Sequence, residues 1–227
     1  MNKVKVSSYH WVALLVVLAF MLLPSNAGAA ITVLCRGEVT SYSGDVQGTS
    51  STSPSPSSNP LPAVNDHVVI TEVYYDVDDD HGTEGKNEWI ELYNGTGAAV
   101  NLANWAITDA SETKRVLPEV QVPADCLVVI TNEELTFDMW PASQEFSGFA
   151  INSLLGNGLG NTGDALYLVD ADGTTIDSLS WGDNTDVFEN PAPDVPEGYS
   201  LARADIYRDR NIASDWIESQ SPSMGKK

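Results

Sequence analysis

The densest group of metal-ligating side chains in the sequence follows its first strand-like run. Asp76, Asp78 and Asp80 stand at alternate positions in an acidic loop. Ca²⁺ takes roughly six to eight oxygen ligands, and the three aspartates match ligand positions one, three and five of the helix–loop–helix calcium loop. The match ends there, because His81 stands where that loop needs glycine and Asn87 where it needs glutamate. These aspartates are a candidate calcium site of non-standard form, and the favoured alternative is a solvated acidic loop.

Three glutamates interrupt otherwise apolar runs: Glu72, Glu88 and Glu91. Two carboxyl groups that face each other across a sugar, about 5–10 Å apart, form the catalytic pair of glycosidases. Glutamates that point inward or lie on edge strands also prevent aggregation between strands, and this is the commoner explanation. A small exported hydrolase using these glutamates is therefore the alternative to a non-catalytic role. Carboxylates that converge in a concave pocket would favour it.

Other catalytic motifs are weak. Residues 158–163 satisfy G-x-G-x-x-G, but a dinucleotide site needs a helix after the motif and here a strand is predicted. A turn that leads into that strand is the better interpretation. His67 and His81, the histidines beyond the N-terminal segment, lie in no recognisable triad or zinc motif. We therefore assign no catalytic residue and expect no cofactor, with calcium at Asp76, Asp78 and Asp80 as the one candidate.

The charge balance limits the partners. The chain has 11 Lys plus Arg against 32 Asp plus Glu, which gives a net charge of −21. Nucleic acid binding needs clusters of Lys and Arg to neutralise phosphates, so we expect no nucleic acid partner. Solubility, or adaptation to a salty medium, accounts for the acidity more simply than a specific cationic ligand.

Residues 1–30 have the pattern of a signal peptide. Lys3 and Lys5 precede an apolar run, and small residues that fit an A-x-A cleavage site follow it. We expect cleavage after Ala29 or Ala30, a secreted or cell-surface protein, and no transmembrane helix after cleavage. Residues 31–63 are rich in Ser, Thr and Pro, carry few large apolar side chains, and are predicted to be a disordered linker.

The two cysteines are Cys35, in the predicted linker, and Cys126, in a predicted strand. In an oxidising compartment they can form a disulfide that fastens the N-terminal segment to the core. Alternatively, Cys126 is a small buried apolar residue. The sequence does not separate these interpretations.

Residues 67–76 and 87–109 set the strand pattern. In the first segment, strict alternation places Val69 and Val73 on one face and Ile70 and Glu72 on the other. The second contains two strand-like runs, NEWIELYN and AVNLANWAITD, which we expect to pair as a hairpin in a β meander. The turn between them carries Asn94-Gly95-Thr96, an acceptor sequence for N-glycosylation.

Further short strands follow at regular spacing. The segments predicted to be strands are 113–117, 126–131, 145–150, 164–170, 174–181 and 198–204. Ala171-Asp172-Gly173 is predicted to be the turn of a hairpin, and CLVVIT at 126–131 a central strand. Short strands without sustained helical periodicity predict an all-β fold, an antiparallel β-sandwich.

The order and spacing of HVVITEVYYD, NEWIELYNGTGAAVNLANWAITD, GLGNTGDALYLVDADGTTIDSLSW, GYSLAR and DWIESQSPSMG resemble the lamin-tail domain in its prokaryotic, exported form. The resemblance implies an immunoglobulin-like β-sandwich over residues 64–227. It also implies a non-catalytic binding or adhesion module. We expect a monomer that recognises a protein or glycan at the cell surface.

Overall fold

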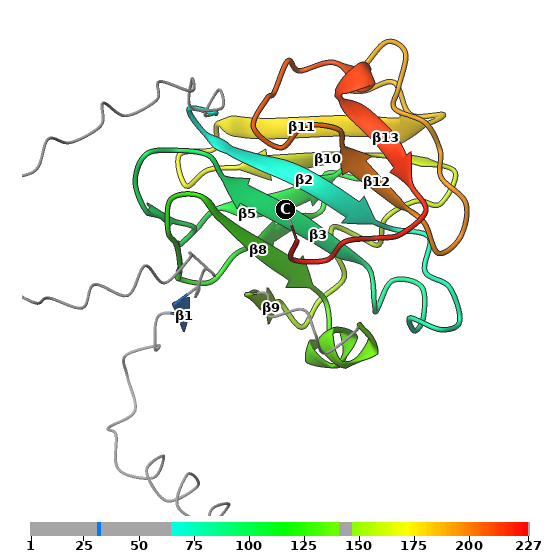
Figure 1. The fold of residues 1–227 in the computed structure, drawn as a ribbon, viewed down its shortest axis with the longest axis horizontal. Coiled ribbons are helices and arrows are strands. Elements are labelled where there is room, and N and C mark those ends of the chain that lie inside the picture. Colours follow the sequence, from blue (N-terminus) through cyan, green and yellow to red (C-terminus); the bar gives the residue numbers. More distant parts are fainter. Residues whose placement is uncertain (1–30, 33–64, 141–146, 227) are drawn as a thin grey trace, which may run out of the picture.

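The computed structural model describes residues 31–32, 65–140 and 147–226, which form two large β-sheets packed face to face and a small third sheet (Figure 1). The predicted signal peptide and most of the predicted linker lie outside the described residues. The first two residues of the predicted linker are ordered: Ile31–Thr32 forms strand β1, which pairs in parallel with Val120 and Gln121. In the described part of the chain, no helix is long and apolar enough to cross a membrane.

The larger sheet has six strands in the order β13-β12-β2-β3-β8-β9. Their bounds are β2 Val68–Tyr74, β3 Trp89–Asn94, β8 Cys126–Thr131, β9 Gly148–Ala150, β12 Ser200–Arg203 and β13 Trp216–Ser219. Every residue of β2 and β3 is buried, because these central strands are covered on both faces. The prediction that CLVVIT is a central strand is confirmed, since β8 lies between β3 and β9.

The second sheet has four strands in the order β11-β10-β5-β6, and the third has the order β1-β7-β4. The bounds are β4 Val100–Asn101, β5 Ala106–Asp109, β6 Lys114–Val116, β7 Val120–Val122, β10 Gly163–Val169 and β11 Thr175–Gly182, with 3₁₀ helices η2 Glu134–Met139 and η3 Ala213–Asp215. Strands β10 and β11 pair antiparallel across the predicted Asp-Gly turn, which confirms that hairpin. An all-β, immunoglobulin-like sandwich is thus the fold.

The predicted hairpin over residues 87–109 is wrong. Strand β3 pairs with β2 and β8 in the six-stranded sheet, whereas β5 pairs with β6 and β10 in the four-stranded sheet. The chain therefore crosses between sheets at this point, as sandwich connections do. The acceptor asparagine of the glycosylation sequence, Asn94, does not project from a turn. It is fully buried, and its side-chain nitrogen donates to the carbonyls of Ala98, Val122 and Pro123, so it could not carry a glycan in this fold.

A β-bulge in β2 overturns the predicted alternation. Ile70 pairs with Leu92 and Glu72 pairs with Glu91, so Thr71 is an extra residue on β2. Ile70 and Val73 therefore both belong to the core between the sheets, although simple alternation placed them on opposite faces. Because a bulge adds one residue, it moves every later side chain to the other face.

The core is double. The main apolar cluster fills the space between the two large sheets and includes Tyr75, which stacks on Trp181 with ring centroids 4.8 Å apart. A second cluster covers the outer face of the six-stranded sheet. Its fully or nearly buried members are Tyr74, Val77, Trp89, Val129, Trp140 and Met224. Met224 comes from the C-terminal segment, so this segment is part of the packed structure.

A buried group of ion pairs and a disulfide also stabilise the fold. The buried guanidinium of Arg203 lies 2.9 Å from the carboxylates of Asp177 and Asp209 and 4.7 Å from the centre of the Trp216 ring. Cys126 is disulfide-bonded. The only other cysteine in the sequence is Cys35, which lies outside the described residues.

A candidate binding groove on the six-stranded sheet

Glu72 and Glu91 lie directly opposite each other on the two central strands of the larger sheet. Both side chains are on the outer face, because Glu91 alternates with the core residues Ile90 and Leu92. Like charges at directly opposed positions destabilise a sheet. The interpretation that these glutamates protect an edge is wrong, since β2 and β3 each have a neighbour on both sides.

Glu91 is almost completely enclosed. Its side-chain oxygens accept hydrogen bonds from the Thr71 hydroxyl at 2.6 Å and from the Gly225 N–H at 2.7 Å. Burial, followed by the charge of Glu72, raises the pKa of Glu91 to about 8, and the two hydrogen bonds oppose this rise only in part. A large share of Glu91 is therefore protonated at neutral pH.

Glu72 is held by three donors. Its carboxylate accepts hydrogen bonds from the Ser200 hydroxyl at 2.5 Å, from the Ser223 N–H at 2.9 Å and from the Ser223 hydroxyl at 2.5 Å. Burial raises the pKa of Glu72, and the hydrogen bonds from the two serines act in the opposite direction. We refer to Glu72 and Glu91 together as the carboxylate pair.

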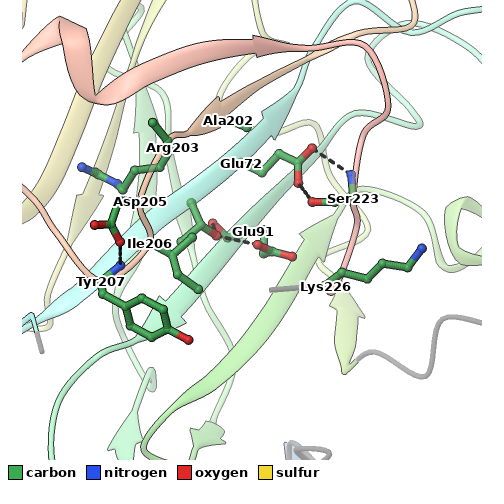
Figure 2. Close-up of a pocket in the computed structure, with 11 residues that line it drawn as sticks. Glu72, Glu91, Ala202, Arg203, Asp205, Ile206, Tyr207, Ser223 and Lys226 are labelled. Carbon is green, nitrogen blue, oxygen red and sulfur yellow. Dashed lines mark hydrogen bonds between the residues drawn. The ribbon is translucent and has the colours of Figure 1, made fainter. Parts of the chain in front are cut away.

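The carboxylate pair forms the floor of a groove of about 460 Å³ (Figure 2). One wall is the segment that follows β12, and the opposite wall is the end of the chain. The lining residues are Thr71, Glu72, Glu91, Ala202, Arg203, Ala204, Asp205, Ile206, Tyr207, Ser223 and Lys226. Tyr207 packs edge-on against Tyr93 of β3, with centroids 5.6 Å apart, which fixes the first wall to the sheet.

Two of the three candidate catalytic glutamates therefore converge on a concave site, which is the feature that would favour a hydrolase. Their chemistry differs from that of a free acid–base pair. Each of the four carboxyl oxygens accepts a hydrogen bond from the chain itself. Glu72 is 2% exposed and Glu91 1%, so neither carboxyl reaches a substrate while the C-terminal segment is in place.

Glu88, the third candidate, lies elsewhere and organises loops. Its carboxylate accepts hydrogen bonds from the N–H groups of Gly85 and Leu159. Burial raises the pKa of Glu88 to about 8. Leu159 belongs to the G-x-G-x-x-G segment, which leads directly into strand β10 at Gly163, as predicted for a turn.

The structure does not bring Asp76, Asp78 and Asp80 together as metal ligands. Asp76 accepts a hydrogen bond from the Asn161 side chain at 2.9 Å, Asp78 lies 2.7 Å from the His81 ring nitrogen, and Asp80 is exposed. Among the described residues, no group of three or more His, Cys, Asp or Glu side chains is arranged to hold a metal ion. Calcium binding by this loop stays a prediction.

The sequence comparison agrees with the architecture. The family model of the lamin tail domain matches residues 62–183, more than half of the chain. The chain belongs to the lamin tail domain family. No curated protein matches the chain. The lamin tail domain is an immunoglobulin-like module that is generally non-catalytic and serves in binding.

The match to the lamin tail domain covers strands β2 to β11, whereas β12, β13 and the C-terminal segment lie beyond it. The groove is built from residues inside the match and from residues beyond it. Its floor comes from β2 and β3 of the matched region, and its walls come from residues 202–207 and 223–226. Ser223, Met224 and Gly225 were missed by sequence reasoning, because a Ser-Pro-Gly-rich tail has no periodicity that distinguishes a packed segment from a loose one.

Proposed function

We propose that this lamin tail domain is an exported, monomeric, non-catalytic module that binds a protein or glycan at the cell surface through the groove on its six-stranded sheet. Export is supported by the signal-peptide pattern of residues 1–30 and by the disulfide at Cys126, which fits an oxidising compartment. Recognition is supported by membership of a family of binding modules.

The observation that carries the proposal is the position of the carboxylate pair. Two buried acidic side chains on adjacent central strands disfavour the sheet, yet both open onto a hollow rather than onto the core. Perturbed titratable groups in a cleft mark candidate functional sites. Each of their carboxyl oxygens already accepts a hydrogen bond from the protein itself. This favours a role in shaping the groove over a role in bond cleavage.

A retention experiment with paired variants tests the proposal. The protein without residues 1–30 is immobilised and offered cell-surface extracts and a glycan array, with calcium and with chelator. Asp205 lines the groove on the wall that follows β12, whereas Asp172 is an exposed aspartate in the turn between β10 and β11. Asp205→Lys is expected to weaken retention at least about ten-fold, which corresponds to about 1.4 kcal/mol, while Asp172→Lys leaves it unchanged. Equal effects of the two variants, or no retained ligand, would contradict the proposal.

A hydrolase that uses the carboxylate pair is the second candidate. The convergence of Glu72 and Glu91 on the groove favours it, together with the pKa of Glu91 at about 8, which suits a general acid at neutral pH. The measurement is turnover of a panel of aryl glycosides and esters. Activity that Glu91→Gln abolishes would establish this function, and activity equal in both proteins, or none, would reject it.

A further inference from the structure

The last described residues, Ser221 to Lys226, form what we call the C-terminal strap. The strap follows β13, belongs to no strand, and runs over the outer face of the six-stranded sheet beside the carboxylate pair (Figure 2). A turn inside it is closed by a hydrogen bond from the Lys226 N–H to the Ser223 carbonyl. The strap contacts the sheet through the side chains of the carboxylate pair and of the outer apolar cluster.

Hydrogen bonds to the carboxylate pair and one buried apolar side chain are among the contacts that join the strap to the sheet. Ser223 donates twice to Glu72, and Gly225 donates once to Glu91. Between these donors, the side chain of Met224 is fully buried in the outer apolar cluster.

Departure of the strap would leave a site with defined chemistry. One oxygen of Glu72 and one of Glu91 would lose their donors, whereas Ser200 and Thr71 would continue to hold the other two oxygens. The position of Met224 would become a socket with aromatic walls, formed in part by Tyr74, Trp89 and Trp140. Two buried acceptors beside one apolar socket fit an extended peptide that offers hydrogen-bond donors on both sides of an apolar residue.

We propose that the C-terminal strap, which forms one wall of the groove, covers the carboxylate pair in cis as an intramolecular peptide ligand, and that it leaves when an extended segment of a partner protein binds. This inference rests on the proposed function and specifies a peptide as the ligand. The Ser-Met-Gly of the strap defines the recognised pattern: a hydroxyl or amide donor, a side chain of methionine size, and a second amide donor. Binding in cis keeps the groove closed to weak ligands.

The test uses the full chain with the strap weakened. Gly225 has φ = 77° and donates its N–H to Glu91, so proline at this position removes the donor and excludes the conformation. Met224→Ala/Gly225→Pro should open the strap, seen as loss of hydrogen-exchange protection at the Ser223 amide. A labelled peptide of residues 219–226 is then titrated against both proteins.

The peptide is expected to bind the double variant about ten-fold more tightly than it binds the wild-type chain, because the strap competes at an effective concentration in the millimolar range. The same peptide with alanine in place of methionine should not bind. Two results would overturn the proposal: an opened strap with no peptide binding, or a Ser223 amide that stays protected in the double variant.

Met224→Ser alone keeps both hydrogen-bond donors and guards against failure of the double variant to fold. It should give an affinity between those of the wild-type chain and the double variant, and an unchanged affinity would also overturn the proposal. Neither measurement requires the surface ligand. A failed ligand search with successful peptide binding would therefore reject the proposed surface role and leave the strap mechanism intact, and the reverse result would reject the strap mechanism alone.

Discussion

Replacement of Glu91 by glutamine should change how the stability of the protein depends on pH. In the folded protein the pKa of Glu91 rises from its ordinary value of 4.5 to about 8, because the side chain is buried opposite Glu72. The folded state therefore binds the Glu91 proton more tightly than the unfolded state does. By linkage, the stabilising effect is complete below pH 4.5 and is lost as pH rises through about 8.

The size of the effect follows from the same values. Between pH 4.5 and 8 the free energy of unfolding should fall by about 1.4 kcal/mol per pH unit on account of Glu91, a total on the order of 5 kcal/mol. Glutamine imitates the protonated acid: its oxygen can accept from Gly225 and its amide can donate to the Thr71 hydroxyl oxygen. Glu91→Gln should therefore match the wild type near pH 5 and exceed it by several kcal/mol near pH 9.

Urea denaturation followed by tryptophan fluorescence, at fixed ionic strength from pH 5 to 9, measures this difference. Glu218→Gln is the matched control, because it removes the same charge from an exposed position on β13. The control curve should run parallel to the wild type. The reasoning is refuted if Glu91→Gln also runs parallel to the wild type, or if it is the less stable protein at pH 9.

Three further predictions concern the buried ion pair, the disulfide and the acidic loop. Arg203→Ala should lower the free energy of unfolding by about 3–5 kcal/mol in the same denaturation assay, because Asp177 would stay buried without its cation; a loss below about 1 kcal/mol would contradict this. Reduction of the disulfide at Cys126 should cost about 2–5 kcal/mol, measured as denaturation with and without dithiothreitol, and equal midpoints would contradict it. Calcium at 5 mM should leave the melting temperature unchanged relative to chelator, since Asp76 and Asp78 already have partners, whereas a rise of about 2 °C or more would establish a calcium site in this loop.

Most strand positions follow from the sequence, whereas the pairing of the strands does not. Period-2 alternation and the Asp-Gly turn located β10 and β11 and their hairpin, because turn chemistry acts between neighbours in the chain. The step from β3 to β5 looks the same in the sequence, yet the two strands lie in different sheets. Period-2 alternation shows that a segment is a strand and does not show which strand it pairs with.

The sequence singled out two residues of the groove, but it did not predict the groove itself. Glu72 and Glu91 stood out as acids in apolar strands, and simple alternation gave no reason to place them together. A single extra residue, Thr71, brings them into register on one face. A bulge of one residue carries no composition signal of its own, so the feature that creates the site is invisible to periodicity.

Several buried acids of this protein accept hydrogen bonds from segments that lie outside the strand ladders. Asp109 accepts from the backbone of Asn157, and Asp164 accepts from the backbone of Gly160. These donors belong to loops whose two ends are fixed by strands, so the loops cannot leave. The carboxylate pair does the same for the C-terminal strap, which follows β13. Buried acids thus hold both the loops between strands and the segment beside the groove, so the role of each acid depends on which segment donates to it.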